Sequence, residues 1–555
     1  MKLRAKPYLV LLAFCLLSAI LAAQDHRSGC DTATGSKFNT EPASGAPEIG
    51  FVVPKSNPSV DFIPGGGIDG SDLVVGGAWD FQGRFNDYLT DPNNPQPIPN
   101  AWGYAQSGYY VHREGTGCGA DFSGPLPPIP GHEQLLAFNQ TSITVDSTRK
   151  LVYAADVRIW PFTTGGTGLL KTTAANLNNP KTCPSGTHNN DANGNPTVAE
   201  QCWPVRVLIG PASSDSGNDQ PDIRADERAS GTGAGDLYLA YFVEGGFGAI
   251  NLVVCPYTFG SAADCSTPMT VSAGEFGPSF PHIAVRPDGV MTLTYTTHSF
   301  NGFSQDIKYL SCVPNGAPKA PTCSQATLVT TEEQPIADTL NTAAHFWFLY
   351  TAPRHDYRLN SATGGYEEFV TWARCKVPFI IPVGDPANGN NFDQCPDADV
   401  VMSYSATDKA GNPLGWSPVL PVNTEPLDQI MPSLQVDHRT NIVHIVYYTS
   451  QWDPPGELVW LVENQIQPNS YAAGPIRRLT TASIDQSVDF ANGNGDFVDL
   501  GVGVRIGVAA RDGRTYVHFI GTNFPGNLGG GPVSHQTNQL TRADSTASGR
   551  TGEKQ

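Results

Sequence analysis

The stretch SLQVDHRTNIVHIVYY, residues 433–448, decides the fold of this chain. It contains a short apolar strand around Val436, the polar turn DHRTN, and a second strand rich in β-branched and aromatic residues. Asp and Asn are residues that hairpin turns prefer, so the stretch predicts a β-hairpin. The same signature returns in three strong and three weaker copies, at residues 142–156, 282–296, 505–521, 59–79, 222–242 and 357–373.

The seven copies indicate a repeat architecture. A third strand follows several of them, for example AINLVVC from Ala249, and a short fourth strand follows that, for example MTV from Met269. Repeated units of four antiparallel strands are typical of a β-propeller. We therefore expect an all-β fold with seven blades, with six blades as the alternative. A β-sandwich would not reuse one hairpin so regularly, and a β-helix would need shorter repeats.

The expected domain boundaries follow from the ends of the repeat. Residues 24–533 are predicted to form a single propeller, with the segment EIGFVVP from Glu48 closing the last blade as an N-terminal strand. No convincing third or fourth strand follows Asn523, so residues 534–555 are predicted to be a disordered polar tail.

The first residues have the features of a secretory signal. A basic segment with Lys2, Arg4 and Lys6 precedes the apolar stretch 8–20, and a small-residue cleavage site ends at Ala23. Residues 1–23 are therefore predicted to be a signal peptide, and the protein to be secreted, periplasmic or exposed at the cell surface. No later segment approaches the ~20 apolar residues of a membrane span, so we expect no membrane insertion once the signal is removed.

The cysteines fit an oxidising compartment. Eleven cysteines less Cys15, which lies in the signal, leave an even number, and this favours disulfides over metal ligands. Four pairs of neighbours flank polar stretches between apolar runs, and the remaining two cysteines would pair over a longer distance. The predicted pairs are Cys183 with Cys202, Cys255 with Cys265, Cys312 with Cys323, Cys375 with Cys395, and Cys30 with Cys118.

The charge of the chain disfavours one class of partner. The formal net charge is −19, and the acidic residues are scattered rather than gathered in runs. Such a surface repels phosphate backbones, so we expect no nucleic-acid binding.

A resemblance to a known group rests on the passage SYSATDKAGNPLGW, residues 403–416. Ser405, Asp408, Gly411 and Trp416 resemble the Asp-box turn, Ser-x-Asp-x-Gly-x-x-Trp, of the sialidase-like, BNR-repeat propellers. Asp408 lies three residues after Ser405 rather than two, and Trp416 is displaced. The resemblance covers most of residues 55–525 and implies an exported, bacterial-type member of that superfamily. Asp boxes are structural turns, so the resemblance implies a fold and not an activity.

The sialidases of this group use three arginines, a Tyr–Glu pair and an Asp acid/base, and they carry an Arg-Ile-Pro motif. This chain has no Arg-Ile-Pro, and its nearest match is Arg158-Ile159-Trp160. Arg84, Arg354, Arg358 and Arg505 could supply an arginine triad, but sialidase activity is the minority interpretation.

Propeller geometry predicts where a ligand binds. The first strand of each blade begins, and the second strand ends, on the same face of the disc, so residues at these places converge on the mouth of the central channel. Trp side chains beside charged groups suit a sugar, and arginines suit the carboxylate of an acidic glycan. For any single residue a turn cap, an inter-blade salt bridge or core packing is the alternative. The ligand-binding candidates are Arg84, Arg158, Trp160, His298, Arg354, His355, Asp356, Trp452, Asp453 and Arg505.

Two reaction types are considered for this face. A glycoside hydrolase needs two carboxyl groups, about 5 Å apart or wider, for which Asp80, Asp156 and Glu244 are the candidates. A polysaccharide lyase would need a base such as His298 or His355 beside an arginine or cation.

A calcium loop is the one cofactor site that the sequence suggests. Asn189, Asp191, Asn193 and Glu200 place oxygen ligands at loop positions 1, 3, 5 and 12, and Gly194 stands at position 6. The alternative is a polar hairpin tip between Cys183 and Cys202.

Three function hypotheses follow. The first is a glycan-binding protein or extracellular binding scaffold acting through the face described above, with a glycan or cell-surface molecule as ligand. The second is a carbohydrate-active enzyme, a glycoside hydrolase of the sialidase-like type before a polysaccharide lyase. The third is a protein-interaction platform.

Overall fold

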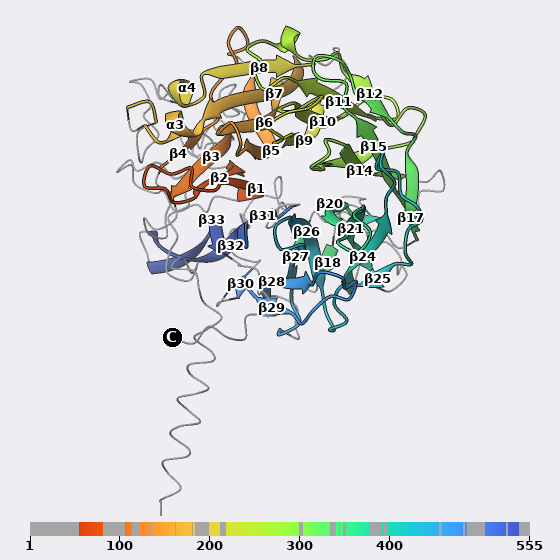
Figure 1. Ribbon diagram of the computed structural model, residues 1–555. Helices are drawn as coiled ribbons and strands as arrows, with labels where there is room; N and C mark the ends of the chain where they lie inside the picture. Colours follow the sequence, from red (N-terminus) through yellow and green to blue (C-terminus); the bar gives the residue numbers. More distant parts are fainter. Residues whose placement is uncertain are drawn as a thin grey trace, which may run out of the picture.

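Seven antiparallel sheets surround a common axis, so the seven-bladed β-propeller predicted from the repeat is confirmed (Figure 1). The structure is a computed structural model. It describes residues 55–80, 106–113, 122–133, 135–160, 163–179, 181–183, 199–210, 218–298, 304–333, 340–342, 345–347, 351–376, 383–384, 391–392, 397–453, 458–480, 483–485, 505–528 and 531–542.

The first three blades have four strands each. Blade 1 contains β1 (Lys55–Ile63), β2 (Leu73–Asp80), β3 (Gln106–Arg113) and β4 (Phe122–Pro125). Blade 2 contains β5 (Leu136–Asp146), β6 (Leu151–Trp160), β7 (Thr163–Thr173) and β8 (Val205–Ile209). Blade 3 contains β9 (Asn218–Ala225), β10 (Leu237–Val243), β11 (Ala249–Cys255) and β12 (Met269–Thr270).

The next three blades add short outer strands. Blade 4 contains β13 (Ser279–Val285), β14 (Met291–His298), β15 (Gln305–Val313), β16 (Thr322–Cys323) and β17 (Thr327–Glu332). Blade 5 contains β20 (Arg354–Leu359), β21 (Tyr366–Cys375), β24 (Ala398–Ala406) and β25 (Leu420–Pro421). Blade 6 contains β26 (Gln429–Asp437), β27 (Ile442–Thr449), β28 (Leu458–Ile466), β29 (Arg477–Arg478) and β30 (Ile484–Asp485).

The remaining described elements are the three strands of blade 7, two small sheets and three short helices. Blade 7 contains β31 (Gly507–Arg511), β32 (Arg514–Leu528) and β33 (Gly531–Arg542). Two small sheets pair β18 (Leu340–Thr342) with β19 (His345–Trp347), and β22 (Val383–Gly384) with β23 (Asn391–Phe392). The short helices are α3 (Ala174–Leu177), α4 (Ala199–Cys202) and η3 (Ala262–Asp264). Among the described residues no helix is long and apolar enough to cross a membrane.

The inner strands share a sequence feature that shapes the channel mouth. Four of them carry a proline near their start, at Pro58, Pro221, Pro281 and Pro432, and Pro353 directly precedes β20. In β9, β13 and β26 the residue before the proline has φ of 51°, 55° and 53°, which non-glycine residues rarely adopt, and the strand register shifts there. Such bulges bend a strand and redirect its side chains, often next to functional sites.

Side chains of the inner strands join each blade to the next. Carboxylate or hydroxyl oxygens accept hydrogen bonds from backbone N–H groups of the following blade, which satisfies donors that are buried away from water. These bonds run from Val145 N to Asp61 (3.0 Å), from Ile223 N to Ser142 (3.2 Å), from Ile283 N to Asp222 (2.8 Å) and from Val436 N to Asp356 (2.8 Å). Asp356, predicted to bind ligand, therefore joins blades 5 and 6.

The ring closes between blades 7 and 1, where β31 and β32 contact β1. Val60, Phe62, Tyr516 and Leu540 share one buried apolar cluster there. The segment from Glu48 that was predicted to close the last blade lies outside the described residues. Residues 534–542 belong to β33 rather than to the predicted polar tail, because the polar alternation of an outer strand resembles a tail in sequence.

Three predicted disulfides are present: Cys183–Cys202, Cys255–Cys265 and Cys312–Cys323. Cys375 is also disulfide-bonded. Its predicted partner Cys395, and the pair Cys30 and Cys118, lie outside the described residues.

The segment that resembles an Asp box contains a turn between β24 and β25. Asp408 accepts a hydrogen bond from Asn412 N (2.8 Å), and Gly411 O accepts one from the Tyr309 hydroxyl of blade 4 (2.9 Å). Trp416 lies 5.3 Å from the Tyr309 ring and packs on the core. The turn therefore has a structural role.

Candidate functional site

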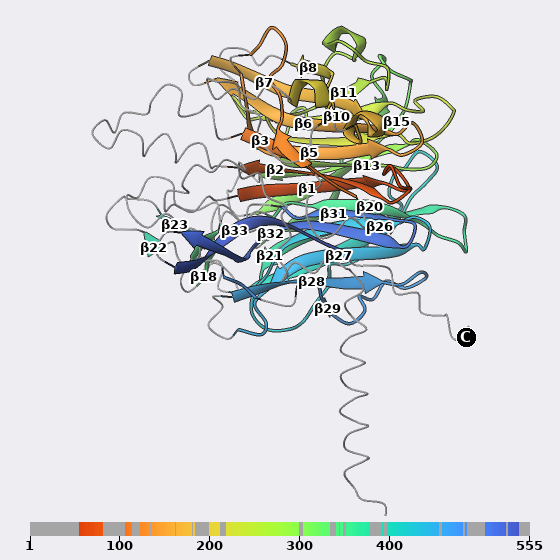
Figure 2. The ribbon, with the colours of Figure 1, turned by 90° about the vertical axis from the view of Figure 1, so that its left-hand side faces the viewer.

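The two faces of the disc differ in how their buried charged side chains are paired. We call the inlet face the one on which the inner strands β1, β5, β9, β13, β20, β26 and β31 begin, and the far face the one on which they end. In the side view of Figure 2, β18, β22 and β23 lie on the left-hand side of the disc.

Two buried arginines stand where inner strands begin at the inlet face. Arg354 is the first residue of β20 in blade 5, and Arg505 lies two residues before β31 in blade 7. Their exposed fractions are only 5% and 7%. Buried arginines are normally paired with acidic side chains. The partners of Arg354 and Arg505 therefore indicate whether the two arginines have a structural or a functional role.

Neither guanidinium group is neutralised by a salt bridge. Arg505 donates a hydrogen bond to the Gln140 side chain of β5, and its Nε is buried without a partner. The Arg354 guanidinium makes no hydrogen bond or ion pair with any residue that the structure describes. Arg505 of blade 7 bonds Gln140 of blade 2, so the two side chains meet past the inner strand of blade 1, which lies between them.

Burial imposes an electrostatic cost on both guanidinium groups. Burial, and then the charge of Arg505, lowers the pKa of Arg354, while Asp222 only partly opposes this. Burial likewise lowers the pKa of Arg505, against the attraction of Asp222 and Asp219. Keeping two guanidinium groups buried at this face without a salt bridge therefore costs stability.

Two carboxyl groups stand on the same face as the arginines. Asp219 is half-buried on β9, and Glu244 is exposed directly after β10. Burial raises the pKa of Asp219 to about 6, with Glu244 adding to the rise and Arg505 opposing it. The inlet face thus combines two buried arginines with a carboxyl group whose pKa is raised to about 6. Glu244 was predicted from the sequence, whereas Asp219 and Gln140 were missed.

Exposed aromatic rings occupy the same face. Phe247, in the turn after β10, is 69% exposed and packs edge-on against Phe276 at 5.5 Å. Trp452, after β27, is 40% exposed and packs edge-on against Trp460 at 5.5 Å. The predicted ligand residue Asp453 lies next to Trp452 and accepts a hydrogen bond from Leu458 N (2.8 Å).

The two predicted histidines lie in different environments. His298 ends β14 and is exposed at the inlet face, beside Gly277. His355 instead lies fully buried, bonded to Thr292 and Thr294 at 2.9 and 2.8 Å. Burial lowers the pKa of His355 to about 3, so it is a neutral core histidine and not the ligand-binding residue predicted.

Asp156 and Arg158 also differ from their predicted roles. Both are fully buried, and Arg158 Nε donates to Asp156 at 2.8 Å. Burial raises the pKa of Asp156 to about 6 despite this partner. A carboxyl group closed off in this way holds blade 2 together and does not reach a substrate.

The remaining predicted site residues cannot be placed. The backbones of Asp80, Trp160 and Glu200 lie in β2, β6 and α4, but their side chains are not described. The other predicted residues lie entirely outside the described ranges: Arg84, Asn189, Asp191 and Asn193. In the part that is described, no group of three or more His, Cys, Asp and Glu side chains could hold a metal ion. Calcium binding stays a prediction.

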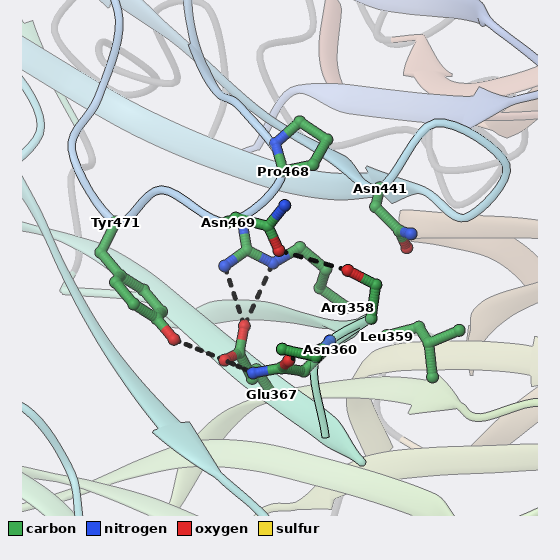
Figure 3. Close-up of a pocket in the computed structure, with 10 residues that line it drawn as sticks. Arg358, Leu359, Asn360, Glu367, Asn441, Pro468, Asn469 and Tyr471 are labelled. Atoms are coloured by element: carbon green, nitrogen blue, oxygen red, sulfur yellow. Dashed lines mark hydrogen bonds and ion pairs between the residues drawn. The ribbon is translucent and has the colours of Figure 1, made fainter. Parts of the chain in front are cut away.

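A pocket of about 200 Å³ lies on the far face between blades 5 and 6 (Figure 3). Arg358, at the far end of β20, donates to Glu367 at 2.8 Å and to the carbonyls of Gln467 and Ser470 at 3.1 and 3.0 Å. Glu367 also accepts from Asn360 (2.6 Å) and Tyr471 (2.5 Å). Every charged group lining this pocket is thus satisfied internally.

The far end of the channel is also neutralised. Arg511 of blade 7 binds Asp61 of blade 1 at 3.0 Å and Glu227 at 2.8 Å, and Arg224 lies 3.7 Å from Asp61. Unneutralised buried charge in the described residues of the channel therefore gathers at the inlet face, which we take as the candidate site.

Comparison with known proteins gives only distant likeness. No family model and no curated protein matches the chain. An α-L-arabinofuranosidase from Fusarium graminearum is 10% identical, with 76% of this chain and 96% of that chain covered and a TM-score of 0.36. An endo-arabinase from Bacteroides thetaiotaomicron is 12% identical, with 62% and 95% covered and a TM-score of 0.31. Neither structure bears on the sialidase resemblance, which stays a prediction from the Asp-box-like turn.

Proposed function

We propose that this propeller binds an acidic glycan at its inlet face, with Arg354 and Arg505 receiving a carboxylate of the sugar. The observation that carries the proposal is Arg354, a guanidinium group that is 5% exposed and has no partner in the described chain. A guanidinium fork matches the planar geometry of a carboxylate and binds it through two parallel hydrogen bonds.

The surroundings favour a glycan over a simple organic anion. Phe247 and Trp452 offer exposed rings on which the C–H faces of sugars pack. Gln140 and Glu244 supply the neutral and acidic hydrogen-bonding groups that hydroxyls need. An extended acidic saccharide could contact both the axis and these outer rings.

Calorimetric titration of the purified, oxidised protein tests this function. The probes are oligogalacturonates, the neutral galactose oligomers of the same length, and inorganic phosphate. We expect binding of the oligogalacturonates alone, and a loss of about 30-fold or more in affinity for Arg354→Met, because a charged hydrogen-bonded pair is removed.

Arg439→Met is the matched control, because Arg439 is an exposed arginine in the far-face turn of blade 6. It should bind within about twofold of the parent protein. Equal affinity for neutral and acidic oligomers, or full affinity in Arg354→Met, would contradict the proposal. Binding of phosphate as tightly as of the saccharide would reduce the site to a general anion receptor.

A further inference from the structure

We propose that His282 is a third binding residue of the inlet face and donates a hydrogen bond from its Nε2 atom to the carboxylate that Arg354 receives. This inference rests on the proposed binding of an acidic glycan and adds a specificity-determining residue to the same site. The position of His282 among the inner strands and the hydrogen bonds at the other end of its ring support this role.

His282 occupies a position that recurs around the channel. It is the first residue of β13 to pair with β14 after the bulge, as Asp222 is the first in β9 and Ser142 the first in β5. In β20 the first paired residue is Arg354. These residues therefore stand at equivalent places in blades 2, 3, 4 and 5, towards the inlet face, with Arg354 next after His282.

The side chain at this position accepts a hydrogen bond from the next blade. Three successive blades show the bond: Ser142 accepts from Ile223 N (3.2 Å), Asp222 from Ile283 N (2.8 Å) and His282 from His355 N (3.4 Å). Each donor directly follows the equivalent residue of its own blade, so the bond from His355 brings the His282 ring next to Arg354. Arg354 cannot continue the series, because a guanidinium group has no acceptor atom.

The bond from His355 fixes the position of the proton on the His282 ring. A backbone N–H group can only donate, so Nδ1 of His282 is the acceptor and carries no proton. The His355 Nδ1 atom lies 3.2 Å from the same atom. Burial, and then the charge of Arg354, lowers the pKa of His282, so its ring is neutral. A neutral ring without a proton on Nδ1 carries its proton on Nε2.

The Nε2 atom of His282 is thus a hydrogen-bond donor, and it has no partner among the described residues. The side chain is only half-buried, so a ligand in the channel mouth can reach it. A neutral donor beside Arg354 adds a bond to a carboxylate without adding a third buried charge. Hydrogen bonds to a charged acceptor are stronger than those to a neutral one, so His282 favours a carboxylate over a hydroxyl group at this place.

Calorimetric titration with oligogalacturonates tests this role through two variants that each keep one nitrogen position of the ring. The amide of His282→Asn reaches the place of Nδ1 and can accept from His355 N, but it leaves no donor at Nε2. We expect this variant to bind about tenfold more weakly and to keep Tm within about 2 °C of the parent protein. His282→Gln places an N–H donor near Nε2 and removes the acceptor for His355 N. It should bind within about threefold of the parent protein and unfold at a lower temperature.

Ser142→Ala is the matched control, because Ser142 has the equivalent position in blade 2 and its hydroxyl bonds Ile223 N and Asp222. It should lower Tm and leave the affinity within about twofold. A second measurement uses the parent protein itself. In NMR spectra of ¹⁵N-labelled histidine, the Nε2–H signal of His282, assigned by its absence from His282→Gln, should move when oligogalacturonate is added.

The outcomes separate this inference from the proposed function. Parent-like affinity in His282→Asn, an equal loss of affinity in both variants, or an Nε2–H signal that the ligand does not move would overturn the role of His282. Each of these results, together with weak binding by Arg354→Met, would leave the proposed function intact. A parent protein that binds no acidic oligomer would instead defeat the proposed function itself.

Discussion

Arg354 and Arg358 lie on one strand, β20, four residues apart, and both are buried. Arg358, at the far end, has a carboxylate, two backbone carbonyls and the Phe369 ring (4.6 Å) as partners. Arg354, at the inlet end, has none within the described residues. Burial and residue type are the same at both places, so the difference in pairing separates the structural arginine, Arg358, from Arg354, which we propose binds a ligand.

The comparison also explains why the far-face pocket is the weaker candidate. A ligand entering it would have to displace hydrogen bonds that Arg358, Glu367 and Tyr471 already make with one another. At the inlet face a carboxylate would instead supply bonds that are missing. Preformed networks stabilise a fold, whereas unsatisfied buried charge is kept at a stability cost where a ligand uses it.

The largest effect is expected from Glu367→Ala, which removes the partner of Arg358. An uncompensated buried guanidinium group should lower the free energy of unfolding by about 3–5 kcal/mol. Urea denaturation followed by fluorescence measures this loss. A loss below about 1 kcal/mol would show that the far-face ion pair is no more than a surface contact.

The neighbouring carboxyl group, Glu368, should make stability depend on pH in the direction opposite to that of Glu367. Burial without a hydrogen-bond partner raises the pKa of Glu368 to about 8. Its contribution to stability is therefore complete below the unfolded pKa near 4.5 and is lost as the pH rises through about 8. The pairing of Glu367 with Arg358 and Tyr471 lowers the pKa of Glu367, so its contribution is lost as the pH falls.

Stability curves between pH 4 and 9 distinguish the two carboxyl groups. Glu368→Gln should flatten the fall above about pH 5, because glutamine stays neutral at every pH. An unchanged slope in Glu368→Gln would assign the pH dependence to another group.

Arg354→Met should have a smaller effect on stability and of the opposite sign. Replacing an unpaired buried cation by an apolar side chain should raise the free energy of unfolding by about 1 kcal/mol while binding of oligogalacturonate is lost. Thermal unfolding and calorimetry on the same preparation measure both. A clear loss of stability would mean that Arg354 has a structural partner, as Arg358 has.

The smallest effect is expected from Tyr471→Phe. The variant removes one hydrogen bond to Glu367 and leaves the bonds from Arg358 and Asn360 in place. The free energy of unfolding should fall by about 0.5 kcal/mol, because two other donors still satisfy the carboxylate. A loss of stability as large as that of Glu367→Ala would show that the hydrogen bond from Tyr471, rather than the ion pair with Arg358, is the main stabilising interaction of Glu367.

Sequence patterns predicted the fold well and the site only in part. All seven hairpin copies became the first two strands of a blade, because alternation and turn chemistry are local properties. Arg354, Arg505 and Glu244 were predicted to stand at the inlet face and do. Asp219 was missed, although it begins an inner strand as Arg354 does, because an Asp before Gln-Pro looks like an ordinary turn residue.

The sequence by itself determined the seven-fold hairpin repeat, the blade order and three of the disulfide pairs now seen, because each depends on residues close together in the chain. Only the tertiary structure decided which buried charges are paired. Asp156 and His355 look like site residues in sequence, yet they find partners within their own blade or the neighbouring one. Arg354 and Arg505 come from blades 5 and 7, which are not neighbours in the ring, and their charges influence each other only because the inner strands close around one axis.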